Sequence, residues 1–464
     1  MNAVPVRVGG GVPVGRFESS CLTGAAACAT TLLVAATWVA AVGAAPPGVF
    51  FEPNVRVTDG STPFLFQVEP YVAVDPANRL FVGWKEADTA DGPGIRVGFA
   101  RSFDGGLSWS PNVLMDRLYR FQTDPWLALD ELGRLYYARL EFSESLFQSQ
   151  GVAVSRSDDA GATWGPVADA DDIRLAFVDK SSIVSDGDGR LYVGYAFVAG
   201  GRTVTGGIRV SRSTDSGVSW SSVAISDAAT NAIGAVLAAG AGGIVHAAWW
   251  DATSGDVFVD RSVDGGITWG ADVRINRMPG SARASSSNPH AQPLPTIVAT
   301  PRGALFVGWA EGSGSDLDIV VARSDDGGTT WGIPVRVNDD ASAREQWQPA
   351  FAVGPDGTLH LAWLDNRTGA YNVFYATSRD GRRWSANVRV TDAETPSAFQ
   401  RPGDYLGLAT GGDGTAYVVW TDGRNGDLDI FFSRSPPSSG TSGTATTSLA
   451  QVPPTRRSER GRSG

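Results

Sequence analysis

Short runs of alternating apolar and polar residues follow one another along almost the whole chain after residue 50. In "YVAVDPANRLFVGW" (71–84), two such runs flank a turn that contains Asp, Pro and Asn. A period of two predicts half-buried β-strands, and turns of a few residues predict that neighbouring strands are antiparallel. The same strand–turn–strand pattern recurs in three further stretches: "WLALDELGRLYYAR" (126–139), "AFAVGPDGTLHLAW" (350–363) and "LGLATGGDGTAYVVW" (406–420).

A third apolar run follows such pairs and ends at a polar turn of constant pattern, Ser-x-Asp-x-Gly-x-x-Trp. The Ser hydroxyl and the Asp carboxylate of this turn are expected to accept hydrogen bonds from its backbone N–H groups. The Gly permits a positive φ, and the Trp is expected to fold back between neighbouring sheets. A fourth strand follows the Trp. The full pattern begins at Ser102, Ser157, Ser213, Ser262 and Ser324, and a shortened form begins at Ser378.

The spacing of these turns sets the number of repeats. The serines recur at intervals of 49 to 62 residues, and one further interval reaches Ser435, where a third strand ends without its turn. "PNVRVTD" (53–59) nearly repeats "ANVRVTD" (386–392), so it can supply the outer strand that this last repeat lacks. Four antiparallel strands at this period are typical of a propeller blade. We therefore predict an all-β, seven-bladed β-propeller over residues 50–435, closed by an N-terminal strand in the last blade.

The repeated turn resembles the Asp box, or BNR repeat, of sialidases and their relatives, and the resemblance covers essentially the whole chain after residue 50. It implies a substrate site at one face of the ring. Family sialidases have six blades, three arginines that bind the substrate carboxylate, a Tyr–Glu nucleophile pair and an Asp acid/base. Here the place of the first arginine reads Val68-Glu69-Pro70, and an acid there should repel a sialic acid carboxylate. The chain is thus closer to seven-bladed, non-classical members than to a true sialidase.

Three residues are candidates for catalysis. Tyr405, in "GDYLGLA" (403–409), occupies a place that resembles the nucleophile position of the family. Asp88 follows the second strand of the first blade and is a candidate acid. Glu141 lies two residues from Arg139 on a predicted strand, so the two side chains share a face.

Two positions in each blade are expected at the channel mouth: the one before the first strand and the one just past the second. Carboxylates crowd both. A carboxylate that recurs from blade to blade also suits a scaffold role, which we favour for Asp365 and Asp422. The first position reads Glu69, Asp124, Lys180, Ile233, Leu294, Gln348 and Tyr405, and the second reads Glu86, Glu141, Phe197, Trp250, Glu311, Asp365 and Asp422. The candidate substrate-binding residues are Glu69, Glu86, Asp124, Arg139, Lys180 and Arg401.

The charge of the chain disfavours a nucleic-acid partner. It has 49 acidic residues against 38 Lys and Arg, a net charge of −11, whereas binding of phosphates needs a basic face. The three histidines lie in separate blades, so we expect no metal site, and no other cofactor is indicated.

The two ends of the chain differ from the repeats. Residues 1–45 have a basic start and an apolar run (27–45) that ends in small residues, which predicts a cleaved signal peptide; a retained membrane anchor is the alternative. Cys21 and Cys28 both lie in this segment, so the mature protein would contain no disulfide. The low-complexity tail, 436–464, is expected to be disordered.

Two functions remain open from the sequence. The first is a secreted, extracellular or periplasmic, sialidase-like propeller that recognises glycans at the channel mouth, with hydrolysis as a further step. The second is a non-catalytic propeller that binds an extracellular protein or acts in assembly. Both are expected to act without a membrane span in the mature protein and as a monomer. Fold alone does not choose between them.

Overall fold

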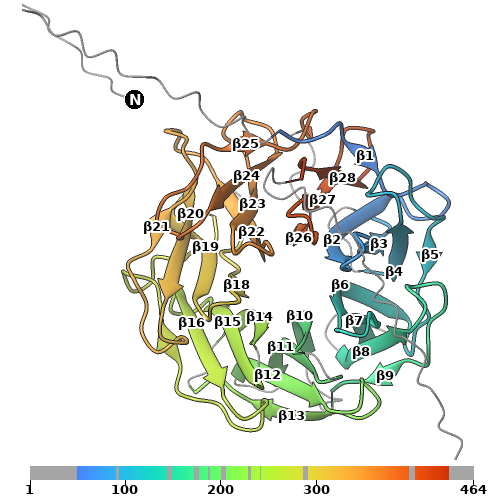
Figure 1. Cartoon of the computed structure of the whole chain (residues 1–464), viewed down its shortest axis with the longest axis horizontal. Helices are drawn as coiled ribbons and strands as arrows, with labels where there is room; N and C mark the ends of the chain where they lie inside the picture. The colour runs from blue at the N-terminus through green and yellow to red at the C-terminus, as the bar shows by residue number, and fades with distance from the viewer. Residues whose placement is uncertain are drawn as a thin grey trace, which may run out of the picture. The chain divides into compact units, whose positions relative to one another are not determined.

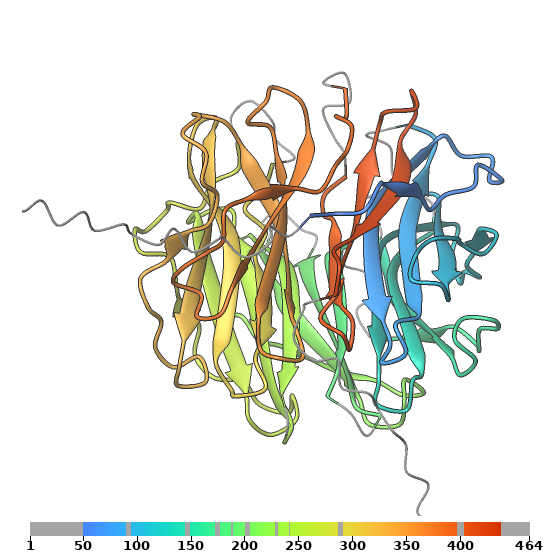
Figure 2. The same cartoon turned by 45° about the horizontal axis from the view of Figure 1, so that its top comes forward.

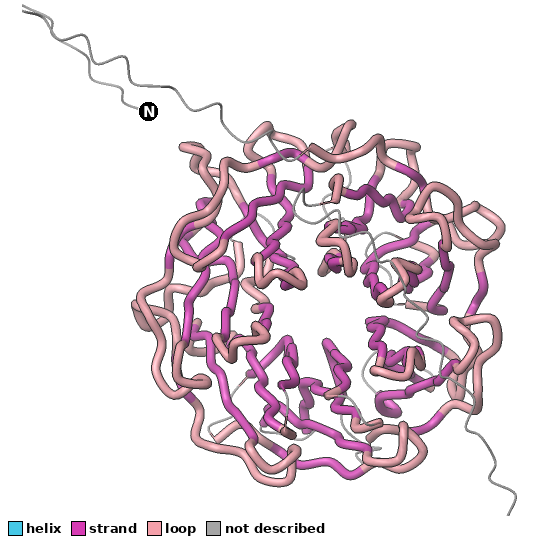
Figure 3. Tube along the Cα trace, in the orientation of Figure 1, coloured by secondary structure: helices cyan, strands magenta, loops and turns pink. Residues whose placement is uncertain are grey.

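A computed structural model describes residues 50–437 except 90–93, 144–148, 172–176, 187–188, 200–204, 228–230, 241, 286–290 and 397–402. The predicted signal peptide, the tail from residue 438 onward and the candidate Arg401 therefore lie outside the described residues. The described residues form strands joined by turns and loops, without helices (Figure 3). It follows that no helix in this part of the chain is long and apolar enough to cross a membrane.

Seven four-stranded antiparallel sheets are arranged as blades around a central axis, which confirms the predicted propeller (Figure 1). The innermost strands of blades 1 to 7 are β2 (Phe66–Val74), β6 (Phe121–Leu129), β10 (Phe177–Ser185), β14 (Ala232–Gly240), β18 (Thr296–Ala299), β22 (Gln346–Val353) and β26 (Gly407–Thr410). The second strands are β3 (Leu80–Ala87), β7 (Leu135–Phe142), β11 (Leu191–Ala199), β15 (Ile244–Asp251), β19 (Leu305–Ser313), β23 (Leu359–Asp365) and β27 (Ala416–Asp422).

The outer half of each blade carries the repeated turn. The third strands are β4 (Arg96–Ser102), β8 (Ser149–Ser157), β12 (Thr205–Ser213), β16 (Asp256–Ser262), β20 (Asp316–Ser324), β24 (Asn372–Ser378) and β28 (Asp429–Arg434). The outermost strands are β5 (Val113–Leu114), β9 (Ala168–Asp169), β13 (Ser221–Ala224), β17 (Val273–Arg274), β21 (Val335–Arg336), β25 (Val388–Arg389) and, in blade 7, β1 (Val55–Arg56).

The ring is closed by the N-terminal strand, as predicted. Val55 pairs with Phe432 and Arg56 with Phe431, so β1 covers the edge of β28 (Figure 2). The Thr58 hydroxyl donates to the buried Asp429 at 2.9 Å, and Arg56 forms an ion pair with the same carboxylate. Blade 7 is therefore built from both ends of the propeller, which leaves no free edge at the junction.

The Ser-x-Asp turns have the expected local chemistry. In the turn after β16, the N–H of Gly266 donates to the Ser262 hydroxyl at 2.8 Å, and the N–H of Thr268 donates to Asp264 at 2.9 Å. The Trp of each turn packs on the preceding blade. Trp109, for example, meets Phe432 of blade 7 edge-on at 5.3 Å between ring centroids. The turns thus fasten neighbouring blades together.

Large side chains fill the layers between blades. Five tryptophans occupy the same central position of the second strand and are fully buried: Trp84, Trp249, Trp309, Trp363 and Trp420. Blades 2 and 3 place Arg139 and Tyr195 at this position instead. Arg139 therefore stands at a packing position of the core, which bears on its role below.

Candidate functional site

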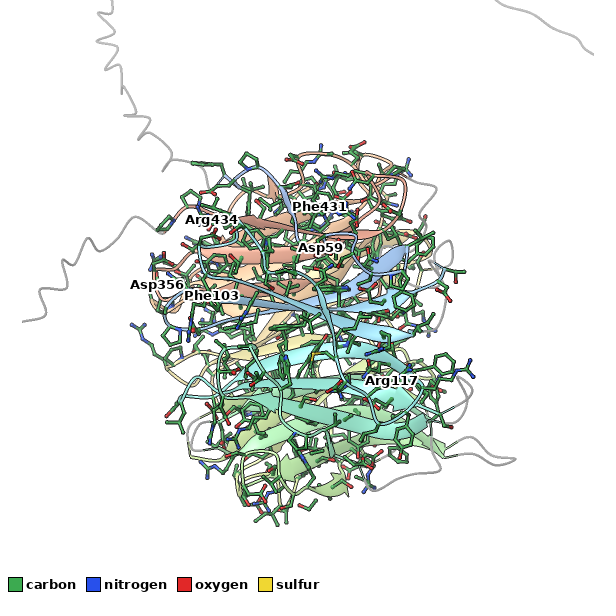
Figure 4. The ribbon with its side chains drawn as sticks, turned by 90° about the vertical axis from the view of Figure 1, so that its right-hand side faces the viewer. Asp59, Phe103, Arg117, Asp356, Phe431 and Arg434 are labelled. Atoms are coloured by element: carbon green, nitrogen blue, oxygen red, sulfur yellow. The ribbon has the colours of Figure 1, made fainter. Side chains whose placement is uncertain are left out.

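The candidate site is a central pocket of about 400 Å³ lined mainly by the innermost strands. Its polar residues come from the starts of these strands, on the side where the chain enters each blade. Figure 4 labels Arg117, in the loop that leads into β6, on one side of the molecule, and Phe103, in a Ser-x-Asp turn, on the other. The pocket mouth and the fastening turns therefore lie at opposite faces.

A β-bulge near the start of the innermost strand shapes the mouth. The register shifts at this point in five blades. Five residues of the bulges have a positive φ, which is costly for any residue but Gly. Bulges re-aim a side chain, and here the side chains of different blades meet one another. The residues and their φ angles are Glu69 (58°), Asp124 (49°), Lys180 (52°), Gly234 (78°) and Gln348 (52°).

This register corrects the predicted alignment in blade 4. Val245 pairs with Ser262 as Leu80 pairs with Ser102, so Val245 is the counterpart of Leu80, whereas the predicted positions Ile233 and Trp250 take Ile244 as that counterpart. Ile244 is in fact 38% exposed. The mouth position of blade 4 is therefore Gly234 rather than Ile233, and the position past the second strand is Asp251 rather than Trp250. The paired positions Ala239 and Val245 are separated by the same number of residues as Val74 and Leu80, and the pair Gly240–Ile244 extends the ladder by one step. The error arose because Ile244 is also apolar, and a one-residue slip turns each side chain to the other face.

Buried ion pairs connect the mouth across blades. Lys180 Nζ lies 2.6 Å from Asp404 Oδ2 and 3.7 Å from Asp124 Oδ1. Lys85 Nζ lies 2.8 Å from Glu69 Oε1, with side chains only 5% and 1% exposed. Three acids and two lysines therefore form one cluster that joins blades 7, 1, 2 and 3.

Burial in this cluster shifts its proton affinities. Burial, together with the nearby Asp124 and Asp404 carboxylates, raises the pKa of Glu69 to about 7, against the opposing effect of Lys85. Burial also raises the pKa of Asp124. The pKa of Lys180 lies well above its ordinary value because the surrounding carboxylates outweigh its own burial. Near neutral pH the site therefore holds a charged lysine beside a carboxyl that can carry a proton.

Aromatic and neutral polar groups complete the mouth. Tyr71 stacks on Trp126 with ring centroids 4.0 Å apart, and Tyr405 lies 5.9 Å from Trp126. Gln348 Nε2 donates to the Gly403 carbonyl at 2.8 Å. Within the described residues, the Tyr405 hydroxyl and Gln348 Oε1 have no hydrogen-bond partner although both are buried. Such atoms are available to a ligand or to water.

Glu86, Glu141 and Arg139 are held elsewhere. Glu86 accepts from the Trp84 indole N–H at 2.9 Å and from Gln67 Nε2 at 2.9 Å. Glu141 accepts from Arg139 Nε at 2.9 Å and from two backbone N–H groups. Of these three candidates none is among the described residues that line the pocket.

The same brace recurs in later blades, which explains why carboxylates recur at this position. Asp365 and Asp422 each accept from the tryptophan two residues earlier and pair with an arginine two residues later. This is the scaffold role that the sequence favoured for them. The recurrence of a carboxylate at this position is therefore a feature of the blade scaffold.

The structure brings four of the predicted residues together and leaves others apart. Glu69, Asp124, Lys180 and Tyr405 lie close together: Lys180 and Tyr405 line the pocket, while Glu69 and Asp124 are buried beside them and do not line it. Asp88 is exposed just past the end of β3. Two residues of the cluster, Lys85 and Asp404, and the pocket-lining Gln348 were not predicted as site residues. Lys85 did leave a signal, because it is the lone cation in the apolar run "LFVGWKEA" (80–87).

Within the described residues, no group of three or more His, Cys, Asp or Glu side chains is placed to hold a metal ion. The carboxylates of the mouth are instead balanced by Lys85 and Lys180.

No protein-family description and no curated protein matches the chain. Several solved structures, however, match the chain. A protein of unknown function from Dyadobacter fermentans superposes with a TM-score of 0.52 at 13% identity, over 84% of this chain and 100% of that one. The Hadza microbial sialidase Hz136 gives 0.52 at 16% identity, over 82% and 68%. The endosialidase of phage phi92 gives 0.52 at 11% identity, over 88% and 72%. At these identities the likeness shows a shared β-propeller fold.

Proposed function

We propose that the protein binds a neutral carbohydrate at the mouth of the central pocket. The observation that carries the proposal is the meeting of an aromatic platform and a polar cluster at one mouth. The stacked Tyr71 and Trp126 are half-buried and line the pocket beside Lys180 and Tyr405. Aromatic faces suit the apolar faces of sugar rings, while a few placed polar groups fix orientation.

The charge of the mouth argues for a neutral ligand. Lys180 is the one cation among the described residues that line the pocket, and it already pairs with Asp404 and Asp124. A sialic acid carboxylate would have to displace one of these acids and approach the others. We therefore expect no turnover, or very weak turnover, of 4-methylumbelliferyl sialoside.

Binding is tested with a glycan array, followed by titration calorimetry on the neutral oligosaccharides that bind. Trp126→Ala is expected to weaken binding at least about tenfold, since loss of about 1.4 kcal/mol has this effect. The matched control is Phe103→Ala, which removes an aromatic side chain that is 57% exposed at the opposite face. Absence of binding to every neutral glycan would reject the proposal and favour the protein-binding alternative.

Hydrolysis of the bound glycan is a second candidate function, favoured by two neighbouring carboxyls: Asp404, which lines the pocket, and Glu69, which is buried in the same cluster and has its pKa raised to about 7. A carboxyl with a pKa near 7 can donate a proton to the leaving oxygen, while an ionised carboxylate accepts the proton of the attacking water. Asp124 and Asp404 are the other carboxylates of the same cluster, so they are the candidates for the group that accepts this proton.

A panel of chromogenic neutral glycosides tests this step. Glu69→Gln should abolish turnover while Glu141→Gln, at the braced position, should retain it. The opposite result would move the catalytic role to Glu141, and turnover unaffected by either variant would remove both residues from the reaction.

We also propose, from the N-terminal segment alone, that the protein is exported. Mass spectrometry of the purified mature protein should find its N-terminus near residue 45. An intact N-terminus in the membrane fraction would instead support a retained anchor.

A further inference from the structure

The seven mouth positions are not evenly polar. Blades 1, 2 and 3 place Glu69, Asp124 and Lys180 there, and blade 7 places Tyr405 next to Asp404. Blades 4 and 5 place Gly234 and Leu294 at the same position, as the paired register shows. Among the described residues that line the pocket, the charged ones are Lys180 of blade 3 and Asp404 of blade 7, and blades 4 and 5 contribute none.

Leu294 covers the apolar side. A Cβ on Gly234 would lie 2.7 Å from Leu294 Cδ2, so the leucine of blade 5 occupies the space that a side chain of blade 4 would take. Leu294 is itself only partly buried and lines the pocket. One side chain therefore forms the wall of two blades at the mouth.

The pocket wall next to Leu294 is also apolar. Val236 follows the bulge in β14 and is partly exposed to the pocket, with Ala235 beside it. Val298 of β18 is also partly exposed there. Thr296 is the one hydroxyl that the described residues of blades 4 and 5 add to the lining. A ligand that is polar on every side would leave its hydroxyls unpaired against this wall, which is costly.

We propose that the ligand is a glycoside that carries an apolar aglycone, an aryl or alkyl group, which packs against Leu294 and Val236. Its sugar ring then lies on Tyr71 and Trp126 toward the charged side. The inference rests on the proposed carbohydrate function and specifies its substrate class. Apolar surface removed from water at the wall supplies affinity, and the polar cluster supplies orientation.

Matched pairs of methyl and phenyl glycosides of glucose, galactose, mannose and arabinose test the inference by titration calorimetry on the whole protein. For the sugars that bind, the phenyl glycoside is expected to bind about tenfold more tightly than the methyl glycoside, from burial of the ring. Leu294→Asn should bring this ratio close to one, because the loss of affinity falls mainly on the phenyl glycoside. Val236→Thr, which keeps the shape of the side chain, should lower the ratio in part and is the variant to use if Leu294→Asn folds poorly.

The outcomes separate the two proposals. Methyl glycosides that bind with a wild-type ratio near one would overturn the apolar subsite and leave carbohydrate binding intact. A ratio near ten that neither variant changes would also overturn it, because the aglycone would then lie elsewhere. Failure of every methyl and phenyl glycoside to bind, while a neutral glycan of the array binds, would overturn the inference and leave carbohydrate binding intact. Failure of the array as well would overturn both.

Discussion

At the scale of single residues, Lys180 balances the charge of the mouth. Its ammonium group holds Asp404 of blade 7 and Asp124 of blade 2, with side chains 11%, 9% and 3% exposed. Removal of one partner from a buried pair leaves an uncompensated charge, which costs far more than the pair contributes. The same lysine would reject a cationic group at this point of the mouth.

Lys180→Met is therefore expected to lower the free energy of unfolding by about 3–5 kcal/mol, measured by urea denaturation. The double variant Lys180→Met/Asp404→Asn should recover part of this loss. Arg156→Met is the control, because Arg156 and Asp158 form an exposed pair. This variant should lower the free energy of unfolding by less than about 1 kcal/mol. Equal losses for the two single variants would show that Lys180 has no special role.

The raised pKa of Glu69 makes stability depend on pH. Its folded-state pKa of about 7 exceeds the ordinary value of 4.5, so the folded state binds more protons between these values. The free energy of unfolding should therefore fall as pH rises from about 4.5 to 7 and level off above. The contribution is on the order of 3 kcal/mol, since one pKa unit corresponds to about 1.4 kcal/mol.

Glu69→Gln should flatten this part of the stability–pH curve, although its total stability falls because Lys85 loses its partner. Denaturation at several pH values measures the slope. Glu131→Gln, in an exposed turn, should leave the slope as it is. A wild-type slope retained in Glu69→Gln would assign the proton to another group.

At the scale of elements, neighbouring blades are joined by reciprocal hydrogen bonds between the ends of their outermost strands. At the joint of blades 5 and 6, the N–H of Asp339 donates to Asn387 and the N–H of Asn387 donates to Asp339. Arg367 pairs with this Asp339. At the joint of blades 3 and 4 the partners are Asp227 and Asp272, two acids. Burial and these two carboxylates raise the pKa of Asp260 to about 6.

Asp339→Asn is expected to lower the free energy of unfolding by a few tenths to about 1 kcal/mol, because it removes the charged partner of Arg367 and keeps an amide oxygen as acceptor. Thermal unfolding at pH 7 measures the loss. Unchanged stability would show that the pair with Arg367 contributes nothing measurable at this joint.

At the scale of the whole molecule, closure by β1 makes the ring depend on its N-terminal residues. Val57 is buried, and Asp429 has no exposed side-chain surface and takes Arg56 and Thr58 as partners. Loss of β1 would uncover the edge of β28, and an uncovered edge pairs readily with other chains.

Deletion of residues 50–60 should therefore cost at least about 3 kcal/mol, from the unpaired Asp429, and should produce oligomers in size-exclusion chromatography. Deletion of residues 440–464 is the control and should change neither elution nor melting temperature. A monomer with the wild-type melting temperature after the first deletion would show that blade 7 is stable with three strands.

Much of the architecture was predictable because local patterns specify it. Alternation identifies strands, the Ser-x-Asp turn is satisfied by its own backbone, and near-identity of 53–59 with 386–392 identifies the closing strand. The candidate site was predictable only in part. Glu86 and Glu141 are as acidic and as close to a strand end as Glu69, yet they are held by Trp84 and Arg139 within their own blades, whereas Glu69 joins the buried cluster with Lys85.

The sequence by itself determined the number of blades and their strand order, since both depend on contacts between residues close in the chain. It also determined the closure, through the near-identity of 53–59 with 386–392. Only the tertiary structure decided which side chains meet at the mouth. Lys180 and Asp404 are 224 residues apart, and they meet because the ring closes. A bulge with positive φ, invisible to a period-two pattern, aims Glu69 and Asp124 at the same point, and burial there changes their proton affinity.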